Sequence, residues 1–122
     1  MANIIVIDDE PDITDMLCTM LSLRGWTVKR ALNRRAALQL IREDPDIHMV
    51  LLDYNMPGMR AEDFLDQIKN LNPKPKVLLF TAAHRVEDRA KQLGIQHYLA
   101  KPFEPDDIYS KIEECLMCSR SS

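Results

Sequence analysis

Six residues with acidic, hydroxyl or amine side chains follow four short apolar runs of this chain. In chain order they are Asp8, Asp9, Glu10, Asp53, Thr81 and Lys101. Carboxylate oxygens suit a hard divalent cation such as Mg²⁺, which takes one or two carboxylates together with water and phosphate oxygens. A lysine and a hydroxyl beside such a cation can hold the remaining oxygens of a phosphoryl group. These residue types therefore indicate metal-assisted phosphoryl chemistry, if the fold brings them together.

The elements that must position these residues follow from an alternation of apolar runs with amphipathic stretches of helical period. We expect strands at 3–7, 26–30, 49–52, 76–80 and 96–99, and helices near 11–23, 34–42, 61–70, 85–93 and 105–117. The first, third and fourth runs are apolar on both faces, as in parallel strands covered on both sides. The alternation predicts an α/β fold with a doubly wound parallel sheet. Sites in such sheets form at the carboxyl ends of the strands, where all six residues fall.

Each of these residues also has a purely structural explanation. Acidic residues around Pro11 at 9–12 suit the start of a helix, where a cap, a first-turn proline and negative charge are all favourable. Lys101 alone would fit a solvated surface lysine, and Thr81 a hydroxyl at a strand end. Asp53 fits such an explanation less well, because a charge at the end of a buried strand is costly unless it is paired or part of a site. Residues suited to phosphoryl chemistry follow four different strands, and this combination favours a functional site over four separate structural explanations.

Composition excludes several classes of protein. The 122 residues fit one domain, and 46% hydrophobic residues are enough for a core, which argues against a disordered chain. A net charge of −3 argues against direct binding to nucleic acid. No apolar run approaches the ~20 residues of a membrane span, and the first residues lack the features of a signal peptide. We therefore expect a cytoplasmic protein without membrane contact.

The cysteines indicate no metal or redox role. Cys115 and Cys118 form a C-x-x-C pair near the end of the chain, but no second pair or nearby histidine completes a metal site. Three cysteines are also too few for a disulfide framework. We expect ordinary core and surface thiols.

Four sequence blocks together resemble the receiver domain of bacterial-type two-component response regulators, of the chemotaxis-regulator-like family. They are Asp8-Asp9, Asp53-Tyr54-Asn55-Met56-Pro57-Gly58-Met59, Thr81-Ala82 and Tyr98-Leu99-Ala100-Lys101-Pro102-Phe103. The resemblance covers nearly the whole chain and predicts a receiver domain at 1–118, followed by a short polar tail at 119–122. It implies a flavodoxin-like sheet of five parallel strands in the order 2-1-3-4-5, with five helices.

The resemblance also implies a role for each residue of the phosphorylation site. Asp53 would accept a phosphoryl group from the phosphohistidine of a histidine kinase. Asp9 would bind Mg²⁺ (or Mn²⁺) directly and Asp8 through water. The backbone carbonyl of Asn55, rather than its side chain, and Asp53 would complete the protein ligands. A cation should be required, because a carboxylate among other carboxylates repels an anionic phosphoryl donor until positive charge offsets the repulsion.

Three further residues would respond to phosphorylation. Lys101 would pair with Asp53 and then with the phosphoryl oxygens, and Thr81 would close its hydroxyl on the phosphoryl group. Tyr98 would turn inward behind Thr81, and the Lys101–Pro102 bond would be cis. The resemblance thus implies a switch in a two-component phosphorelay that changes the surface of the fourth helix, fifth strand and fifth helix. It implies no enzymatic activity beyond the chain's own phosphorylation and dephosphorylation.

Two segments depart from the family pattern. Asn33-Arg34 stands where the family usually has Asp/Asn-Gly, and Arg60-Ala61 where it often has Asp-Gly. We expect both to lie away from the phosphorylation chemistry and to affect docking surfaces instead. Asp106 stands where the subfamily with winged-helix DNA-binding outputs often has a basic residue, which disfavours that subfamily's dimer.

The expected partners are a sensor histidine kinase or phosphotransfer protein and a downstream protein or output domain, with the chain a monomer or weak homodimer. A haloacid-dehalogenase-type phosphatase is one alternative, but it needs a second aspartate where Asn55 stands, and room for a cap domain. A flavodoxin is another, but the acidic segment 8–10 would repel a flavin phosphate. A third is a pseudo-receiver that only binds partners, which the intact site disfavours. Turnover of a generic phosphate ester would favour the phosphatase, whereas stoichiometric, hydroxylamine-labile labelling would favour the receiver.

Overall fold

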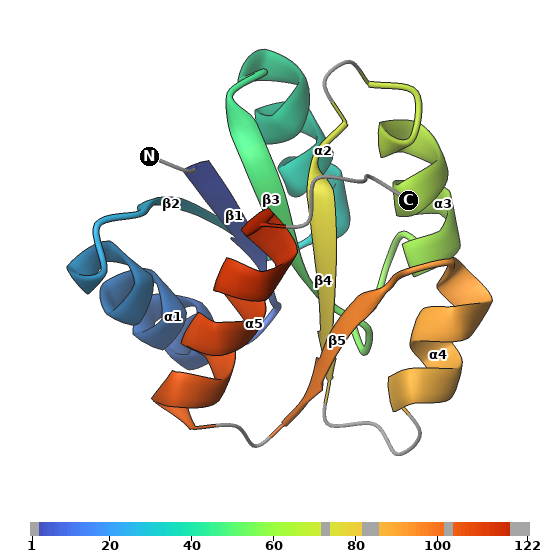
Figure 1. The fold of residues 1–122 in the computed structure, drawn as a ribbon. Helices are drawn as coiled ribbons and strands as arrows, with labels where there is room; N and C mark the ends of the chain where they lie inside the picture. Colours follow the sequence, from blue (N-terminus) through green and yellow to red (C-terminus); the bar gives the residue numbers. More distant parts are fainter. Residues whose placement is uncertain (1–2, 72–73, 82–85, 102–103, 118–122) are drawn as a thin grey trace.

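The strands form one parallel sheet. The computed structural model describes residues 3–71, 74–81, 86–101 and 104–117. Its strands are β1 (Asn3–Ile7), β2 (Thr27–Ala31), β3 (Ile47–Asp53), β4 (Lys76–Thr81) and β5 (His97–Ala100). Their order in the sheet is β2-β1-β3-β4-β5, and every neighbouring pair is parallel (Figure 1). The predicted fold class and strand order are confirmed.

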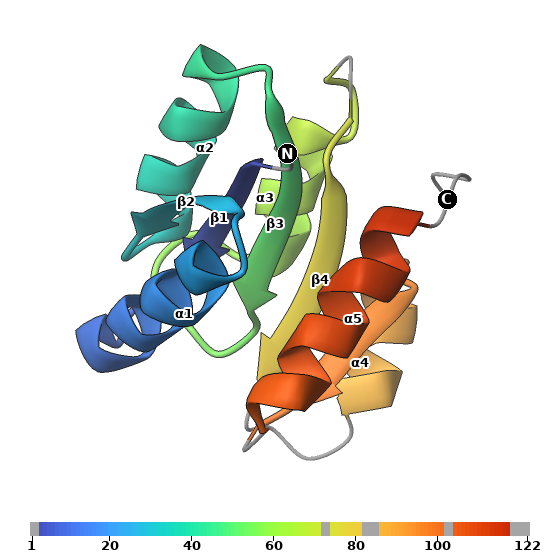
Figure 2. The ribbon, with the colours of Figure 1, turned by 60° about the vertical axis from the view of Figure 1, so that its left-hand side comes forward.

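Helices cover both faces of this sheet. They are α1 (Pro11–Leu23), α2 (Arg34–Glu43), α3 (Ala61–Ile68), α4 (Val86–Leu93) and α5 (Pro105–Met117). Helices α1 and α5 lie on one face, and α2, α3 and α4 lie on the other (Figure 2). The chain therefore has three layers, with the sheet in the middle.

The strand sequences explain why the sheet is buried on both faces. In β1, Ile4 and Val6 pack with α1 and α5, whereas Ile5 and Ile7 pack in the cluster under α2, α3 and α4. All four side chains are fully buried. Side chains at successive positions of a strand point to opposite faces of the sheet, so a strand that is buried on both faces must be apolar at successive positions. The continuous apolar runs therefore correctly predicted central strands.

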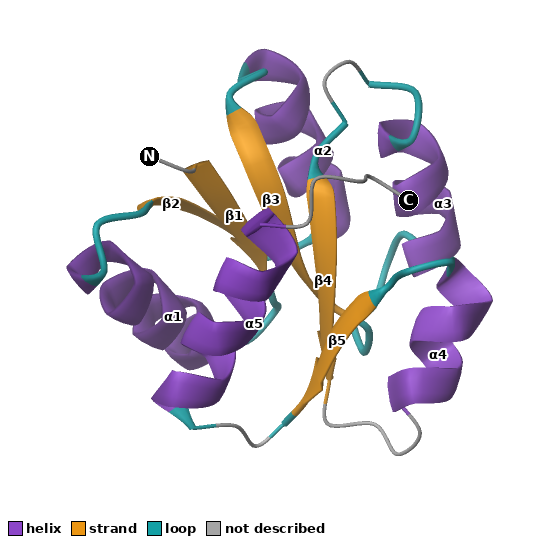
Figure 3. Cartoon of the chain, in the orientation of Figure 1, coloured by secondary structure: helices purple, strands orange, loops and turns teal. Residues whose placement is uncertain are grey.

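Figure 3 shows the helices, strands and loops of the described chain. The boundaries of these elements differ from the sequence prediction by one to two residues at several ends. Strand β3 begins at Ile47, two residues before the predicted start, because the exposed His48 interrupts the apolar run without interrupting the strand. Glycines follow two of the helices: Gly25 and Gly94 come after α1 and α4 with φ of 91° and 73°, a region that glycine adopts without strain.

Several predictions lie outside the described residues. These are the first residue of the fourth predicted helix, the Lys101–Pro102 bond, Cys118 and the tail at 119–122. Of the other cysteines, Cys115 is buried and Cys18 is half-buried. Among the described residues, every helix is too short or too polar to cross a bilayer.

Candidate functional site

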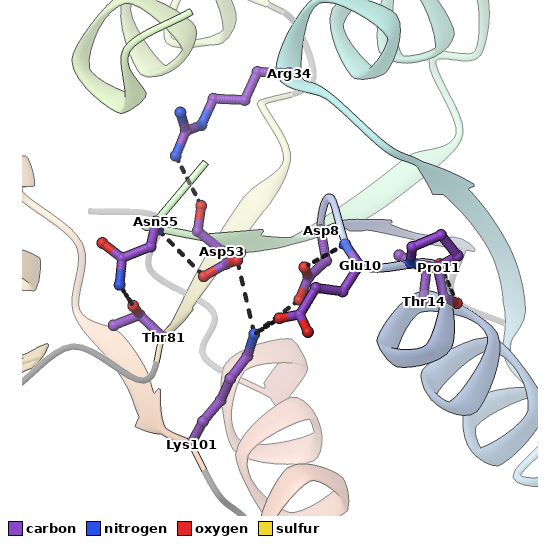
Figure 4. A network of polar contacts seen from close by, with 9 residues as sticks. All are labelled: Asp8, Glu10, Pro11, Thr14, Arg34, Asp53, Asn55, Thr81 and Lys101. Carbon is purple, nitrogen blue, oxygen red and sulfur yellow. Dashed lines mark hydrogen bonds and ion pairs between the residues drawn. The ribbon is translucent and has the colours of Figure 1, made fainter. Parts of the chain in front are cut away.

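The predicted site residues gather at the carboxyl edge of the sheet. Asp8 directly follows β1, Asp53 ends β3, Thr81 ends β4 and Lys101 follows β5. Asp8 and Thr81 are fully buried, and Asp53 is 3% exposed. Backbone bonds tie the strand ends together, since the Lys101 amide donates to the Thr81 carbonyl at 2.9 Å. The fold therefore brings together residues that are up to 93 positions apart in the chain (Figure 4).

Lys101 is the shared cation of the site. Its Nζ lies 2.9 Å from Asp8 Oδ2, 3.7 Å from Asp53 Oδ2 and 4.0 Å from Glu10 Oε1 (Figure 4). The predicted pairing of Lys101 with Asp53 is present, but its shorter contact is to Asp8. One ammonium group thus faces three carboxylates, which leaves a surplus of negative charge around it.

Asp53 is held in an unfavourable environment for a carboxylate. Burial raises the pKa of Asp53 from 3.8 to about 6, Lys101 opposes this rise, and Asp8 and Asp9 add to it. The Asn55 amide donates to Asp53 Oδ1 at 3.3 Å and favours the charged form only weakly. A cation or a bound group that relieves this crowding would therefore be stabilised at the site.

The acidic segment after β1 offers a donor set for a hard cation. The carboxylate oxygens of Asp8, Asp9 and Glu10 lie within 4.8 Å of one another. Asp9 and Glu10 are exposed, so water could complete a coordination shell, and all the donors are oxygens, as Mg²⁺ requires. Glu10 was not predicted as a ligand, and Asp53 lies outside this group of three. The residues present fit a divalent cation.

The alternative explanation of this segment as a helix start holds only in part. Pro11 does occupy the first turn of α1, and Thr14 Oγ1 donates to the Pro11 carbonyl at 2.9 Å. The N-cap residue Glu10, however, makes no capping bond with its side chain, which lies near Lys101. The Asp8 carboxylate accepts from the Glu10 amide at 3.0 Å. The side chains of Asp8 and Glu10 therefore lie near Lys101, and that of Glu10 does not cap the helix.

The side chain of Asn55 has a contact that was not predicted. Its Nδ2 donates to Thr81 Oγ1 at 3.0 Å, and so links the loop after β3 to the end of β4 (Figure 4). Thr81 is thereby held by a neighbour of Asp53 from the β3–α3 loop. Only the backbone of Asn55 was expected to matter, and sequence alone gave no sign of this bond, because it depends on the conformation of the loop.

Arg34, the first residue of α2, is the site residue that sequence reasoning missed. It is 2% exposed, and its Nη2 donates to the carbonyls of Asp53 and Tyr54, both at 2.8 Å. The Asn33-Arg34 departure was expected to lie away from the predicted site, whereas Arg34 contacts the backbone of Asp53 directly. A signal was available: Arg34 precedes the buried Leu38 and Ile41 by four and seven positions, which places it on the buried face of the helix.

Tyr98 lies in β5, half-buried, and packs against the cluster under α2, α3 and α4. Residues 82–85, which follow Thr81, lie outside the described residues. The predicted movement of Tyr98 stays a prediction.

Comparison with known proteins decides the family. The family model for the response regulator receiver domain matches residues 4–113. The chain belongs to this family. As a receiver domain, its general function is that of a phosphorylation-controlled switch in two-component signalling, where such domains interact with histidine kinases and output domains.

Relatives of this receiver domain include both longer and similar-sized proteins. The probable transcriptional regulatory protein TcrX of Mycobacterium tuberculosis is 34% identical over 117 residues, which cover 93% of this chain and 49% of TcrX. The sporulation initiation phosphotransferase F of Bacillus subtilis is 30% identical over 117 residues, or 93% of each chain. The receiver domain thus spans about half the length of several curated relatives that it matches.

Solved structures agree with this assignment. A response regulator receiver domain protein from Clostridium thermocellum has a TM-score of 0.84 and 28% identity, covering 95% of this chain and 94% of its own. The response regulator TrrA from Thermotoga maritima, solved in complex with Mg(2+)-BeF, has a TM-score of 0.82 and 27% identity, covering 94% of this chain and 99% of its own.

Proposed function

We propose that Asp53 is the phosphoacceptor of this receiver domain and that it works with a divalent cation, Mg²⁺ or Mn²⁺. The observation that supports this proposal most strongly is the convergence of Asp8, Asp53, Thr81 and Lys101 at one edge of the sheet, with Asp53 buried among them. Family membership supplies the reaction class, and the geometry favours Asp53 as the carboxylate that reacts.

The transfer would proceed at one carboxylate oxygen. An Asp53 oxygen attacks the phosphorus of a phosphohistidine, a P–O bond forms, and the P–N bond breaks, with its electron pair leaving on the imidazole nitrogen. The product is an acyl phosphate on Asp53 and a histidine that takes a proton from water. Such a transfer needs positioning and charge neutralisation more than covalent help from the protein.

The cation would be held by the acidic segment beside Asp53. When bound, it supplies positive charge that offsets the repulsion between carboxylates and the incoming phosphoryl group. Asp9 would bind it directly and Asp8 through water, with Asp53 and the carbonyl of Asn55 as further ligands. The close pairing of Lys101 with Asp8 supports this division, because Asp8 already has a cationic partner. The similarity to TrrA, solved with Mg(2+)-BeF, also supports a cation site.

The switch would act through Lys101, Thr81 and Tyr98. The Lys101 ammonium, already 3.7 Å from Asp53 Oδ2, can follow the new phosphoryl oxygens. Thr81 Oγ1, which accepts from Asn55 Nδ2, would donate its hydroxyl hydrogen to the phosphoryl group, and Tyr98 would move into the space behind it. The surface formed by α4, β5 and α5 would change as a result, and this change is the signal.

The upstream partner would be a sensor histidine kinase or a phosphotransfer protein, and the downstream partner an output domain or a separate protein. The receiver domain would extend over 1–118, with 119–122 as a polar tail. Catalysis would be limited to the domain's own phosphorylation and dephosphorylation. A cytoplasmic location, a monomeric or weakly dimeric state and the lack of direct contact with nucleic acid or membrane stay predictions.

The test is labelling with a small phosphodonor such as acetyl phosphate. Wild-type protein should take up one phosphoryl group per chain when Mg²⁺ is present and none in excess EDTA. Asp53→Ala should abolish the label, whereas Asp66→Ala, which removes an exposed acid of α3, should leave it unchanged. Undiminished labelling of the Asp53→Ala protein would show that the acceptor lies elsewhere.

A further inference from the structure

Arg34 places a charged side chain in the interior, beside the loop that joins β3 to α3. It lies at the N-terminus of α2, on the same helix face as the buried Leu38 and Ile41. The guanidinium group points at the backbone near Asp53 (Figure 4). A buried arginine needs hydrogen-bond partners, because its charge cannot be lost by deprotonation.

The partners of Arg34 are four backbone carbonyls of one segment. Nη2 donates to the carbonyls of Asp53 and Tyr54 at 2.8 Å each, and Nη1 donates to those of Met59 at 2.6 Å and Met56 at 3.5 Å. These residues span the loop from the end of β3 almost to α3. The planar guanidinium group, a rigid fork of N–H donors, therefore ties the start, middle and end of the loop together.

Asn55 lies between two of the carbonyls that Arg34 holds. It bears three features of the site: the amide that donates to Asp53 Oδ1, the side chain that donates to Thr81 Oγ1, and the carbonyl proposed as a metal ligand. The backbone of the loop sets the direction of all three. Whatever fixes Tyr54 and Met56 therefore also limits where Asn55 can lie.

Arg34 also forms no ion pair with another described residue. Within the described part of the chain, its contacts are to carbonyl oxygens and none is to a carboxylate. Among the residues that the structure describes, its buried Nε has no hydrogen-bond partner, which costs free energy that the four carbonyl bonds must offset.

We propose that Arg34 is a positioning residue of the phosphorylation site, which holds the β3–α3 loop so that Asn55 faces the cation, Asp53 and Thr81. This inference rests on the proposed function of Asp53. Some residues do not touch a metal ion but hydrogen-bond to its ligands and orient them. Removing such a residue typically lowers metal affinity or activity by about 10–100-fold.

The experiment compares Arg34→Lys and Arg34→Met with wild type. Lysine keeps the positive charge but loses the planar fork, and methionine loses both while filling much of the space. Ile41→Ala is the matched control, because it removes a buried side chain from the same face of α2 without touching a loop carbonyl. Urea unfolding first gives the stability of each variant, so that binding is measured where every protein is folded.

Two readouts report on the loop. Mg²⁺ binding is measured by calorimetry, and amide hydrogen exchange at residues 54–59 is measured without metal. Both Arg34 variants should bind Mg²⁺ at least about tenfold more weakly than wild type. Their amide exchange should be faster than in wild type, and this increase should be larger in the loop than in β1 and β3. The control should lose stability while keeping wild-type Mg²⁺ affinity and wild-type exchange in the loop.

Three results would overturn the inference. Arg34→Lys could match wild type in both readouts, which would show that charge alone suffices. Both variants could bind Mg²⁺ normally, or the Ile41→Ala control could lose as much affinity as they do, which would reduce Arg34 to a stabilising residue. If Arg34→Met does not fold, Arg34→Lys decides. Failure of the wild-type protein to bind Mg²⁺ or to be phosphorylated would instead contradict the proposed function, so the two failures are distinguishable.

Discussion

Replacing Asp53 with asparagine should make the metal-free protein more stable at neutral pH. The substitution keeps the shape of the side chain and the oxygen that accepts from the Asn55 amide, but it removes a buried negative charge. Lys101 loses its 3.7 Å contact to Asp53 and keeps the 2.9 Å contact to Asp8. The variant therefore relieves the crowding of carboxylates and leaves the ammonium paired.

The size and pH dependence of the gain follow from the raised pKa of Asp53. A pKa of about 6 in the folded protein, against 3.8 otherwise, corresponds to at most about 3 kcal/mol, since each pH unit is worth about 1.4 kcal/mol. Because this figure is an upper limit, we expect a gain of about 1–3 kcal/mol. Below pH 3.8 both states hold the proton and the penalty vanishes. It grows as the pH rises toward 6 and is constant above that.

The assay is urea unfolding in EDTA at pH 7.5 and pH 4, followed by circular dichroism. Asp53→Asn should exceed wild type by about 1–3 kcal/mol at pH 7.5 and by much less at pH 4. Asp66→Asn, which removes an exposed acid, should show no such gain. The reasoning is refuted if Asp53→Asn is no more stable than wild type at pH 7.5, or if its gain is the same at both pH values.

Three further predictions concern the metal and the switch. Mg²⁺ should raise the melting temperature of wild type, with about 1.4 kcal/mol of stabilisation at ten times its dissociation constant, and Asp9→Ala should lose most of that gain. An unchanged wild-type melting curve would argue against a cation site. Lys101→Ala should still accept phosphate from a small donor, because Asp53 remains, but the amide shifts of α4 and β5 on phosphorylation should shrink; wild-type shifts in this variant would show that another residue transmits the change. Tyr98 should become more buried with a beryllofluoride mimic, since burial of an aromatic ring favours the inward position by on the order of 1–3 kcal/mol, and crystal structures with and without the mimic would test this. An ordered, inward Tyr98 in both states would rule out its role in the switch.

The sequence predicted the sheet and the convergence of the site for the same physical reason. Runs such as Ile4–Ile7 are apolar at every position, so the strands had to be covered on both faces and therefore parallel. Parallel strands end at one edge, which brings Asp53 and Lys101 together without knowledge of any side-chain contact. The start of β3 was missed because His48 is polar and exposed within the strand.

Side-chain contacts that depend on loop conformation could not be predicted. The bond from Asn55 to Thr81 requires the β3–α3 loop to turn toward β4, and no local pattern encodes that turn. Arg34 was read as a departure from a glycine position, although its spacing from Ile41 placed it on the buried helix face. Its partners are backbone carbonyls, which every residue has, so the sequence carried no complementary charge that would have identified them.

The most direct test of Asp53 as phosphoacceptor is to locate the acyl phosphate in the chain. Wild-type protein is phosphorylated with a small phosphodonor and Mg²⁺, reduced with borohydride, which converts an aspartyl phosphate to homoserine, and sequenced by mass spectrometry after digestion. We predict homoserine at position 53 alone, and none when Mg²⁺ is replaced by EDTA. Homoserine at Asp8 or Asp9, or a stable phosphate on another residue with Asp53 unmodified, would contradict the account.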